Sequence, residues 1–156
     1  AIKETFNLPA KVKWPNDVLL YEKKVAGILL EIKAEVDALE YALIGIGVNV
    51  NNPVGEKNFM LPAISIKEAL GKEVERKPLL ENLFLNFENL LSKKEEILKI
   101  WKDLSETLGK EVKVITPSKT YIGLARDLDE EGRLILETKE GEIIRISSGD
   151  CLHLRI

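Results

Sequence analysis

The chain has 156 residues, of which 45% are hydrophobic and 31% are charged, and its formal net charge is −3 at pH 7. This composition supports an ordinary hydrophobic core and is not that of a disordered tail, and the interspersed charges form no basic stripe that would favour nucleic acid as a partner. No apolar run approaches the about 20 residues of a membrane span and no signal-peptide pattern opens the chain, so we expect a soluble, cytoplasmic protein without a membrane partner.

The first residues predict the end of a helix followed by a strand. Residues 1–8 mix apolar and charged side chains, and Asn7 and Pro9 stand where a helix C-terminus places them. The sequence opens without Met, so we expect this helix to begin further upstream. Val12 and Trp14 then alternate with two lysines, as in a strand with one buried face.

A stiff corner and a hairpin follow this strand. Pro15 restricts its own backbone and that of the residue before it, so Asn16 and Asp17 are presented from a rigid turn. Residues 18–30 read VLLYEKKVAGILL, two apolar runs around a charged centre, which predicts a β-hairpin whose second arm carries Lys24. Taken singly, Asn-Asp after proline is more often turn chemistry than a site, and a lysine near a hairpin turn is more often solvated than catalytic.

The next strand is predicted from a nearly continuous apolar run. Residues 33–40 are polar and turn-like, and residues 41–50 read YALIGIGVNV, the pattern of a central strand buried on both faces. Gly45 and Gly47 are two positions apart and therefore lie on one side of the sheet, as does Asn49. Bare backbone there either accommodates packing or lets a ligand lie against the strand, and the pattern alone does not separate these alternatives.

Helices fill the middle of the chain. Residues 51–62 read as a loop, and Ser65 with Glu68 forms a capping box that opens a short helix ending at Gly71. Pro78 suits the first turn of a longer helix, which the charged run at 92–96 kinks or breaks. We expect the apolar stripes of these helices to belong to the core; they comprise Leu80, Leu83, Phe84, Phe87, Leu90, Leu91, Ile97, Leu98, Trp101, Leu104 and Leu108.

The last part of the chain predicts a separate β unit. From Lys110 to Ile156 about five short strands alternate with turn signals, the spacing of a small β-barrel. Cys151 and His153 are the single cysteine and histidine of the chain, and both fall in its final strand. One of each cannot make an internal disulfide or a metal cluster, so we expect packed strand residues and name no metal ligand.

Residues 13–31, KWPNDVLLYEKKVAGILLE, resemble the central motif of the biotin protein ligases. The segment Gly45–Asn49, GIGVN, resembles a second motif of that family, and the final strands resemble its SH3-like C-terminal domain. The resemblance implies an α+β (α/β) fold, with a mixed sheet and helices similar to those of class II aminoacyl-tRNA synthetases. It places the C-terminal part of the catalytic domain at 1–108 and the SH3-like barrel at 109–156.

The resemblance also implies an activity. These enzymes activate biotin with MgATP as biotinyl-5′-AMP and transfer it to a lysine of a biotin carboxyl carrier protein. Lys24 matches the family lysine that contacts biotin and nucleotide, and Gly27 lies where the biotin ring approaches the backbone. The implied nucleotide-binding residues are Asn16, Lys24, Gly45, Gly47 and Asn49.

The roles of two residues of the first motif, Asp17 and Lys13, are not decided by the resemblance. Asp17, a second candidate catalytic residue, could orient Lys24, share a Mg²⁺ with the phosphates or accept a proton from the acceptor lysine. For Lys13 we expect a position on the surface.

The sequence departs from the family in one respect. Biotin protein ligases carry a Gly- and Arg-rich loop upstream of KWPND, and nothing in this sequence matches it. We therefore expect the chain alone to be incomplete, and to act as a homodimer or with a partner chain that carries the missing segment. The alternatives are a relative of the lipoate–protein ligases and octanoyl transferases, or a non-catalytic module that binds biotin or the carrier.

Overall fold

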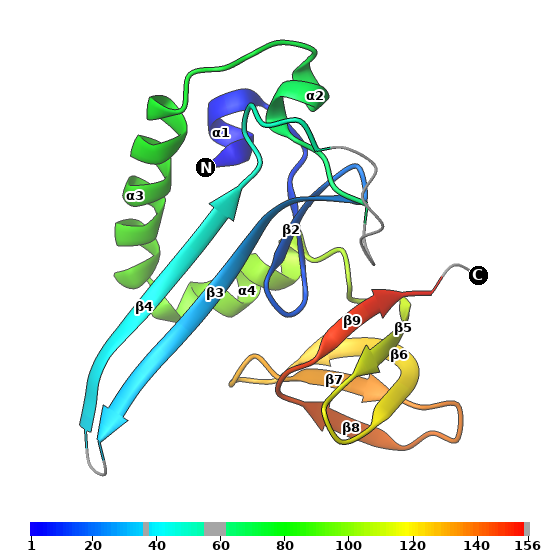
Figure 1. Cartoon of the computed structure of the whole chain (residues 1–156). Coiled ribbons are helices and arrows are strands. Elements are labelled where there is room, and N and C mark those ends of the chain that lie inside the picture. The colour runs from blue at the N-terminus through cyan, green and yellow to red at the C-terminus, as the bar shows by residue number, and fades with distance from the viewer. Residues whose placement is uncertain (36–37, 55–61, 155–156) are drawn as a thin grey trace. The chain divides into compact units, whose positions relative to one another are not determined.

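The computed structural model describes residues 1–35, 38–54 and 62–154 (Figure 1). The chain divides into two compact units, one formed by Asn16–Val74 and the other by Ala1–Pro15 together with Glu75–Ile156. Helices and antiparallel strands occur in both, which confirms the expected α+β class. No helix within the described part of the chain combines the length and apolar character needed to cross a membrane.

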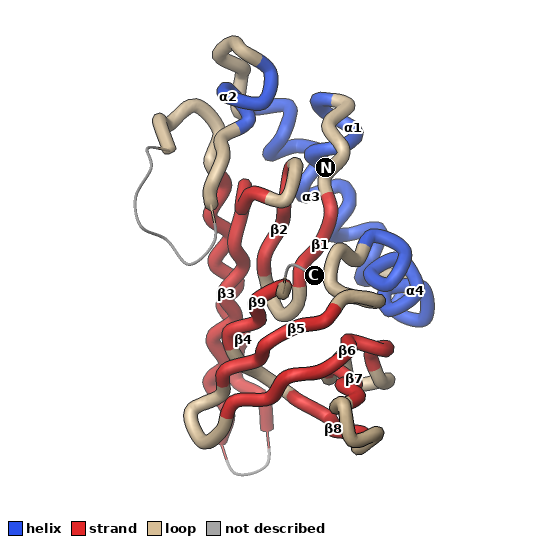
Figure 2. The backbone as a smooth tube through the Cα atoms, turned by 90° about the vertical axis from the view of Figure 1, so that its right-hand side faces the viewer, coloured by secondary structure: helices blue, strands red, loops and turns tan. Residues whose placement is uncertain are grey.

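The unit Asn16–Val74 is built on three strands in the order β2-β3-β4 (Figure 2). Both pairings are antiparallel, and the predicted hairpin is confirmed: Leu20 lies opposite Lys23, and Tyr21 and Glu22 form the turn with positive φ angles. The strands are β2 (Asp17–Leu20), β3 (Lys23–Glu35) and β4 (Ala38–Val48).

Two expectations about these strands are wrong. The expected turn at 33–40 is too long, because β3 continues to Glu35 and β4 begins at Ala38; residues 36 and 37 between them lie outside the described residues. The strand at 41–50 is not central, since β4 ends the sheet order. Its apolar side chains, and those of β3, are exposed on both faces, at Ile28, Leu29, Leu30, Ile32, Tyr41, Leu43, Ile44 and Ile46.

The short helix α2 (Ile66–Leu70) completes this unit and forms as predicted. The Ser65 hydroxyl accepts from the Glu68 amide at 3.2 Å, and a Glu68 carboxylate oxygen accepts from the Ser65 amide at 2.7 Å. Gly71 ends the helix at a φ of 71°. The predicted loop at 51–62 lies largely outside the described residues.

The other unit begins with α1 and β1 and continues with α3 and α4. Pro78 lies in the first turn of α3, and the chain breaks before α4, both as predicted. Asn82 donates to the Thr5 hydroxyl at 2.9 Å, which ties α3 to α1. These elements are α1 (Ile2–Phe6), β1 (Lys11–Lys13), α3 (Lys77–Leu91) and α4 (Lys94–Leu104).

Burial in these elements differs from the expectation at several positions. Lys13, expected on the surface, is only 5% exposed, because β1 runs beside the segment that follows α4. In α3 the buried residue is Leu79, whereas the side chains expected in the core are exposed at Leu80, Phe84, Phe87 and Leu91.

The C-terminal strands form a five-stranded antiparallel sheet in the order β8-β7-β6-β5-β9, as the turn signals predicted. Its buried side chains form a core to which Leu98 and Trp101 of α4 add a second layer, so the expected core role of Trp101 is confirmed. Cys151 is buried and His153 is half-buried in the last strand, as expected. The strands are β5 (Glu111–Ile115), β6 (Thr120–Leu128), β7 (Leu134–Glu137), β8 (Ile143–Ile146) and β9 (Asp150–His153).

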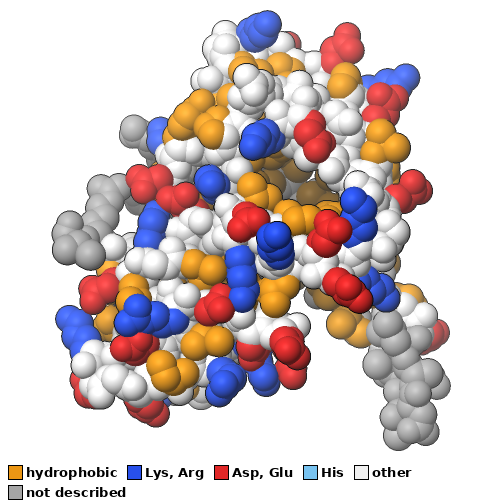
Figure 3. Space-filling model, turned by 180° about the vertical axis from the view of Figure 1, so that it is seen from behind, with side chains coloured by type: hydrophobic (Ala, Val, Ile, Leu, Met, Phe, Trp, Pro, Cys, Tyr) orange, Lys and Arg blue, Asp and Glu red, His pale blue; other side chains and the backbone are white. Residues whose placement is uncertain are grey.

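Charged side chains of both signs are interspersed over the surface seen in Figure 3. Acidic and basic groups alternate there instead of gathering into one field, as the near balance of 23 basic and 26 acidic residues indicates. Long-range electrostatic attraction of a polyanion is therefore not favoured on this face.

Candidate active site

The corner after Pro15 is held against β3 by a pair of hydrogen bonds. The Ile28 amide donates to the Asn16 carbonyl at 2.9 Å, and the Asn16 side-chain amide donates to the Ile28 carbonyl at 2.8 Å. Asn16 thus bonds residue 28 through both its backbone and its side chain, which fixes the direction in which its remaining amide groups point. The stiff corner predicted from the sequence is clamped onto the hairpin.

The backbone of Lys24 is held from both sides. Leu19 of β2 lies opposite it, and on the other side the Lys24 amide donates to the Pro62 carbonyl at 2.8 Å while its carbonyl accepts from the Ile64 amide at 3.0 Å. The neighbouring Val25 is fully buried. The Lys24 side chain therefore projects from a backbone that is held on both sides. Functional side chains are positioned most precisely when they lie on such well-held elements.

The side chain of Lys24 folds across Gly27 to reach Asp17. The ammonium lies 2.5 Å from a carboxylate oxygen of Asp17, with the lysine side chain 41% exposed and the aspartate only 12% exposed. Asp17 lies directly opposite Gly27 in the β2–β3 ladder. A Cβ at Gly27 would stand 3.0 Å from Lys24 Cε and 3.1 Å from Nζ, so the path of the lysine depends on the missing side chain.

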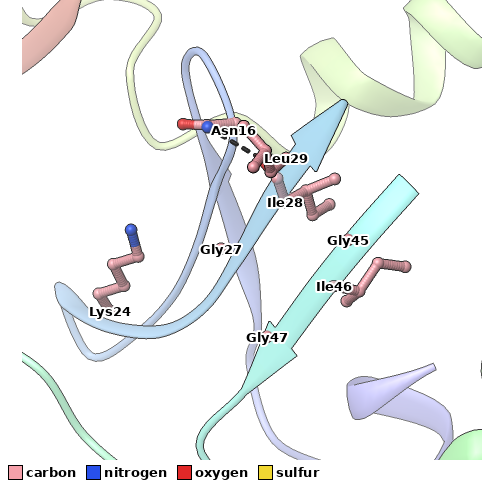
Figure 4. Close-up of a pocket in the computed structure, with 8 residues that line it drawn as sticks. All are labelled: Asn16, Lys24, Gly27, Ile28, Leu29, Gly45, Ile46 and Gly47. Atoms are coloured by element: carbon pink, nitrogen blue, oxygen red, sulfur yellow. Dashed lines mark hydrogen bonds between the residues drawn. The ribbon is translucent and has the colours of Figure 1, made fainter. Parts of the chain in front are cut away.

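Lys24 and Gly27 line a cavity of about 490 Å³ (Figure 4). Its size falls within the range of sites for small ligands, about 300–1,000 Å³. Asn16 and Lys24 supply its polar side chains, and the other lining residues belong to strands β3 and β4. The cavity is lined by Asn16, Lys24, Gly27, Ile28, Leu29, Gly45, Ile46 and Gly47.

The floor of the cavity is bare backbone on one face of the β3–β4 ladder. Gly27 pairs with Gly47, and Leu29 pairs with Gly45, so alternate positions of two strands place three glycines together. The predicted common side for Gly45 and Gly47 is confirmed, and Gly27 joins them. Such a floor lets a flat ring approach the peptide groups closely.

Two of the predicted site residues are not among those that line the cavity: Asp17, which reaches it through its ion pair with Lys24, and Asn49. Asn49 lies after the end of β4, is half-buried, and is not among the residues that line the cavity. Its side-chain oxygen accepts a hydrogen bond from the side-chain amide of Asn52 at 3.1 Å. The nucleotide-binding role expected for Asn49 stays a prediction.

Sequence reasoning missed the apolar lining at Ile28, Leu29 and Ile46. The alternation of strand residues contained the signal for Leu29, since it shares its side of β3 with Gly27. The cross-strand register that brings it opposite Gly45 was not visible from the sequence.

Two family models place the chain in the class of biotin and lipoate protein ligases. The family model for the biotin/lipoate A/B protein ligase family matches residues 2–49, and the model for the biotin protein ligase C-terminal domain matches residues 107–154. The first match contains the corner and all of the residues that line the cavity. The second contains all of the C-terminal sheet.

Two of the most similar solved structures are biotin protein ligases and not lipoate ligases. An apo biotin protein ligase from Aquifex aeolicus is 33% identical with a TM-score of 0.81, covering 99% of this chain and 69% of that chain. The same ligase in complex with biotin and ATP is 34% identical with a TM-score of 0.77, covering 99% of this chain and 66% of that chain. The chain belongs to the biotin protein ligase family.

Curated relatives are longer than the present chain. The bifunctional ligase/repressor BirA of Bacillus subtilis is 34% identical, with 96% of this chain and 48% of that protein covered. A biotin–[acetyl-CoA-carboxylase] ligase of Mycobacterium tuberculosis is 31% identical, with 92% of this chain and 53% of that protein covered. The chain thus spans about half the length of the curated relatives that it matches.

Proposed function

We propose that this chain carries the reactive lysine of an ATP-dependent biotin protein ligase, which activates biotin as biotinyl-5′-AMP and transfers it to a lysine of a biotin carboxyl carrier protein. The observation that carries the proposal is the Lys24 ammonium, held over Gly27 at the edge of a cavity with a glycine floor. Family membership supports biotin and ATP as the ligands, since a solved relative binds both.

In the first half-reaction a biotin carboxylate oxygen attacks the α-phosphorus of ATP and pyrophosphate leaves. Both reactants are anionic, so their approach is repulsive unless a cation lies between them. The Lys24 ammonium supplies that cation and stabilises the negative charge that grows on the phosphoryl oxygens. Its ion pair with Asp17 holds it in place, and an ammonium has three N–H donors with which to contact further anions.

The remaining cavity residues bind and orient the ligands. Gly27 lets the biotin ring approach β3, and Gly45 and Gly47 leave space along β4 for the nucleotide. The Asn16 carboxamide donates one N–H to the Ile28 carbonyl and retains a second N–H and its oxygen for the adenine edge. Leu29 adds an apolar contact beside these polar groups.

Magnesium enters such a reaction with ATP. Among the described residues, no group of three or more His, Cys, Asp and Glu side chains gathers as metal ligands. Asp17 is paired with Lys24.

In the second half-reaction the acceptor lysine attacks the carbonyl carbon of the biotinyl-adenylate and AMP leaves. The attacking amine loses a proton in this step, for which we propose the Asp17 carboxylate as the acceptor, while the adjacent Lys24 ammonium stabilises the charge on the leaving phosphate. We assign the activity to a ligase that contains the rest of the family fold. Homodimerisation and a separate partner chain for the missing loop stay predictions.

The test is a lysine substitution in the complete ligase. Lys24→Ala should lower the rate of pyrophosphate release with biotin and ATP about 10²-fold or more, as for loss of one well-aimed electrostatic donor. Lys23→Ala is the matched control, because Lys23 is the exposed neighbour in the same strand and does not line the cavity. Equal rates for Lys24→Ala and Lys23→Ala would contradict the assignment.

Ligand titration separates the alternatives. Calorimetry with biotin and with lipoate should show binding of biotin, and a preference for lipoate would favour the lipoate–protein ligase relatives. If the complete ligase binds biotin and ATP but forms no biotinyl-adenylate, the chain belongs to a binding module without turnover.

A further inference from the structure

Strand β3 carries a β-bulge directly beside Lys24. Val18 of β2 lies opposite Ala26, but the next residue of β2, Leu19, lies opposite Lys24. Val25 is therefore an extra residue of β3, with no position of its own on the partner strand. Bulges of this kind bend a strand locally and change the direction of the side chains next to them.

The bulge decides which face of β3 the Lys24 side chain occupies. Successive side chains of a regular strand point to opposite faces, so residues three positions apart, such as 24 and 27, would lie on opposite faces. One extra residue returns them to the same face. Burial agrees with this count, because the consecutive residues Val25 and Ala26 are both buried, whereas Lys24 and Gly27 on either side of them line the cavity (Figure 4). Without the bulge, the lysine would leave from the face away from the cavity.

The other edge of β3 at the bulge is closed by a segment that does not belong to β4. The pairing of β4 ends opposite Ala26, and Lys24 instead forms a parallel bridge with Ala63. The Lys24 amide donates to the Pro62 carbonyl at 2.8 Å, and the Ile64 amide donates to the Lys24 carbonyl at 3.0 Å. Because a bulge disrupts the ladder on the β2 side, these two bonds are important for holding the backbone of Lys24.

This segment is fixed by the start of α2. Ser65, the residue that follows it, is fully buried and forms the capping box with Glu68. Ile66 is also fully buried, and its amide donates to the Asn49 carbonyl at 2.9 Å. The Asn49 amide in turn donates to the Val25 carbonyl at 2.8 Å. The capped end of α2 is thus joined to the bulge both through the segment before it and through the residue that follows β4.

Glu68 is the exposed member of this arrangement. One of its carboxylate oxygens accepts from the Ser65 amide at 2.7 Å, and the other accepts from the Val54 amide at 3.3 Å. The side chain therefore holds the backbone at two points, and its removal leaves the buried residues around it unchanged. Loss of such a box loosens the first turn of a helix and the chain that enters it.

We propose that Ser65 and Glu68 are positioning residues, which hold the bulge at Val25 and so keep Lys24 on the cavity face of β3. They touch no reacting atom and act through the backbone of residues 62–64. All of these residues belong to the compact unit Asn16–Val74. The catalytic consequence rests on the proposed function, but the placement of the Lys24 side chain does not.

The test of placement is NMR on the chain with two substitutions of one residue. Glu68→Ala removes the acceptor of the Ser65 amide, and Glu68→Gln retains an acceptor oxygen. The Lys24 and Ile64 amides should exchange about tenfold faster in Glu68→Ala and near the original rate in Glu68→Gln. The nuclear Overhauser effect between the Lys24 Hε and Gly27 Hα protons, which reports the lysine lying over the glycine, should weaken in Glu68→Ala alone.

Glu73→Ala is the matched control. The Glu73 carboxylate pairs with the Lys67 side chain at 2.8 Å, so this substitution removes the same charge near α2 and leaves the capping box in place. The Ile28 amide, which donates to the Asn16 carbonyl outside the bulge, reports general opening of the hairpin. If the two test amides exchange no faster in Glu68→Ala than in Glu73→Ala, or if the Ile28 amide accelerates equally, the proposal is overturned.

The catalytic consequence is measured in the complete ligase as pyrophosphate release with biotin and ATP. Glu68→Ala should lower kcat about tenfold, because a displaced ammonium no longer faces the charge that grows in the transition state, and Glu68→Gln should recover it. In a Lys24→Ala background, Glu68→Ala should cause no further loss, since both substitutions act through the same ammonium. A residue that merely stabilises the fold would lower the rate in both backgrounds.

Additive losses in the two backgrounds would overturn the positioning role and leave the proposed function standing. An unchanged kcat in Glu68→Ala, despite faster exchange of the test amides, would do the same. Absence of adenylate formation in the unmodified ligase would overturn the proposed function and leave the placement result standing.

Discussion

At the scale of single residues, the geometry of the site depends on an absent side chain. The Lys24 ammonium can cross β3 and reach Asp17 because residue 27 is glycine. Gly47 lies opposite Gly27 on the same face, but a Cβ there would find its nearest atom at 4.0 Å. The two glycines therefore offer a comparison in which only one affects the lysine.

We predict that Gly27→Ala displaces the Lys24 side chain and Gly47→Ala does not. The new methyl group at 27 would stand within 3.1 Å of the ammonium, and the flexible end of the lysine would move more readily than the strand. The chemical shift of Lys24 ¹³Cε, measured by NMR, should change in Gly27→Ala alone. Both variants should unfold at or slightly above the original midpoint, because alanine restricts the unfolded chain more than glycine does.

An unchanged Lys24 shift in Gly27→Ala would show that the lysine does not lie over residue 27 in solution. A loss of stability in Gly27→Ala beyond that in Gly47→Ala would mean instead that the strand moves.

At the scale of elements, the N-terminus of α2 is held by a capping box between Ser65 and Glu68, and the Glu68 carboxyl is a titratable group. The bond from the Ser65 amide lowers the pKa of Glu68 below its ordinary value of 4.5, with a further contribution from the Ser65 hydroxyl. A carboxyl whose pKa is lowered by folding contributes stability above its unfolded pKa, and this contribution disappears as the pH falls through the folded pKa. The start of α2 should therefore weaken below pH 4.5.

We predict that the Ser65 amide proton shift titrates with a midpoint below 4.5 and that Glu68→Gln removes this titration. Gln retains an oxygen that can accept from the Ser65 amide but carries no charge, so it is the matched control for the box itself. The measurement is a series of ¹H–¹⁵N spectra between about pH 6 and 3. A midpoint at or above the ordinary value would show that the box does not form.

Elements with local signals were predictable. The hairpin turn at 21–22, the capping box at Ser65, the glycine that ends α2 and the break before α4 all depend on residues within a few positions of each other. The limits of β3 and β4 were not predictable, because the polar sequence at 33–40 fits both a turn and the ends of two strands. Only pairing between distant residues decides between these structures.

At the scale of the whole molecule, burial is uneven between the two sheets. Val112, Val114, Leu134 and Leu136 are fully buried in the C-terminal sheet. The outer part of the β3–β4 ladder exposes its apolar side chains on both faces, up to 60% at Ile32. Hydrogen-bonded strands with little burial open locally at low free energy.

We predict that amides of residues 28–33 and 41–46 exchange at least about 10²-fold faster than those of 112–114 and 134–136. Residues 19, 20 and 25 are the internal control, since they lie in the β2–β3 hairpin but are buried, and their amides should be protected. The measurement is hydrogen exchange by NMR on the chain. Equal protection of the outer and buried parts of β3 would contradict the prediction.

The sequence by itself determined the local chemistry of this protein: a proline-stiffened corner with two polar residues, a lysine on a hairpin arm, glycines at alternating positions and a β-rich C-terminal region. Each follows from backbone restriction or from the period of a strand, which act over a few residues. The tertiary structure decided that Gly27 lies opposite Gly47, that Lys24 reaches Asp17, that Lys13 is buried and that Trp14 belongs to the C-terminal core. These depend on register and on packing between segments up to 118 positions apart, which no local pattern encodes.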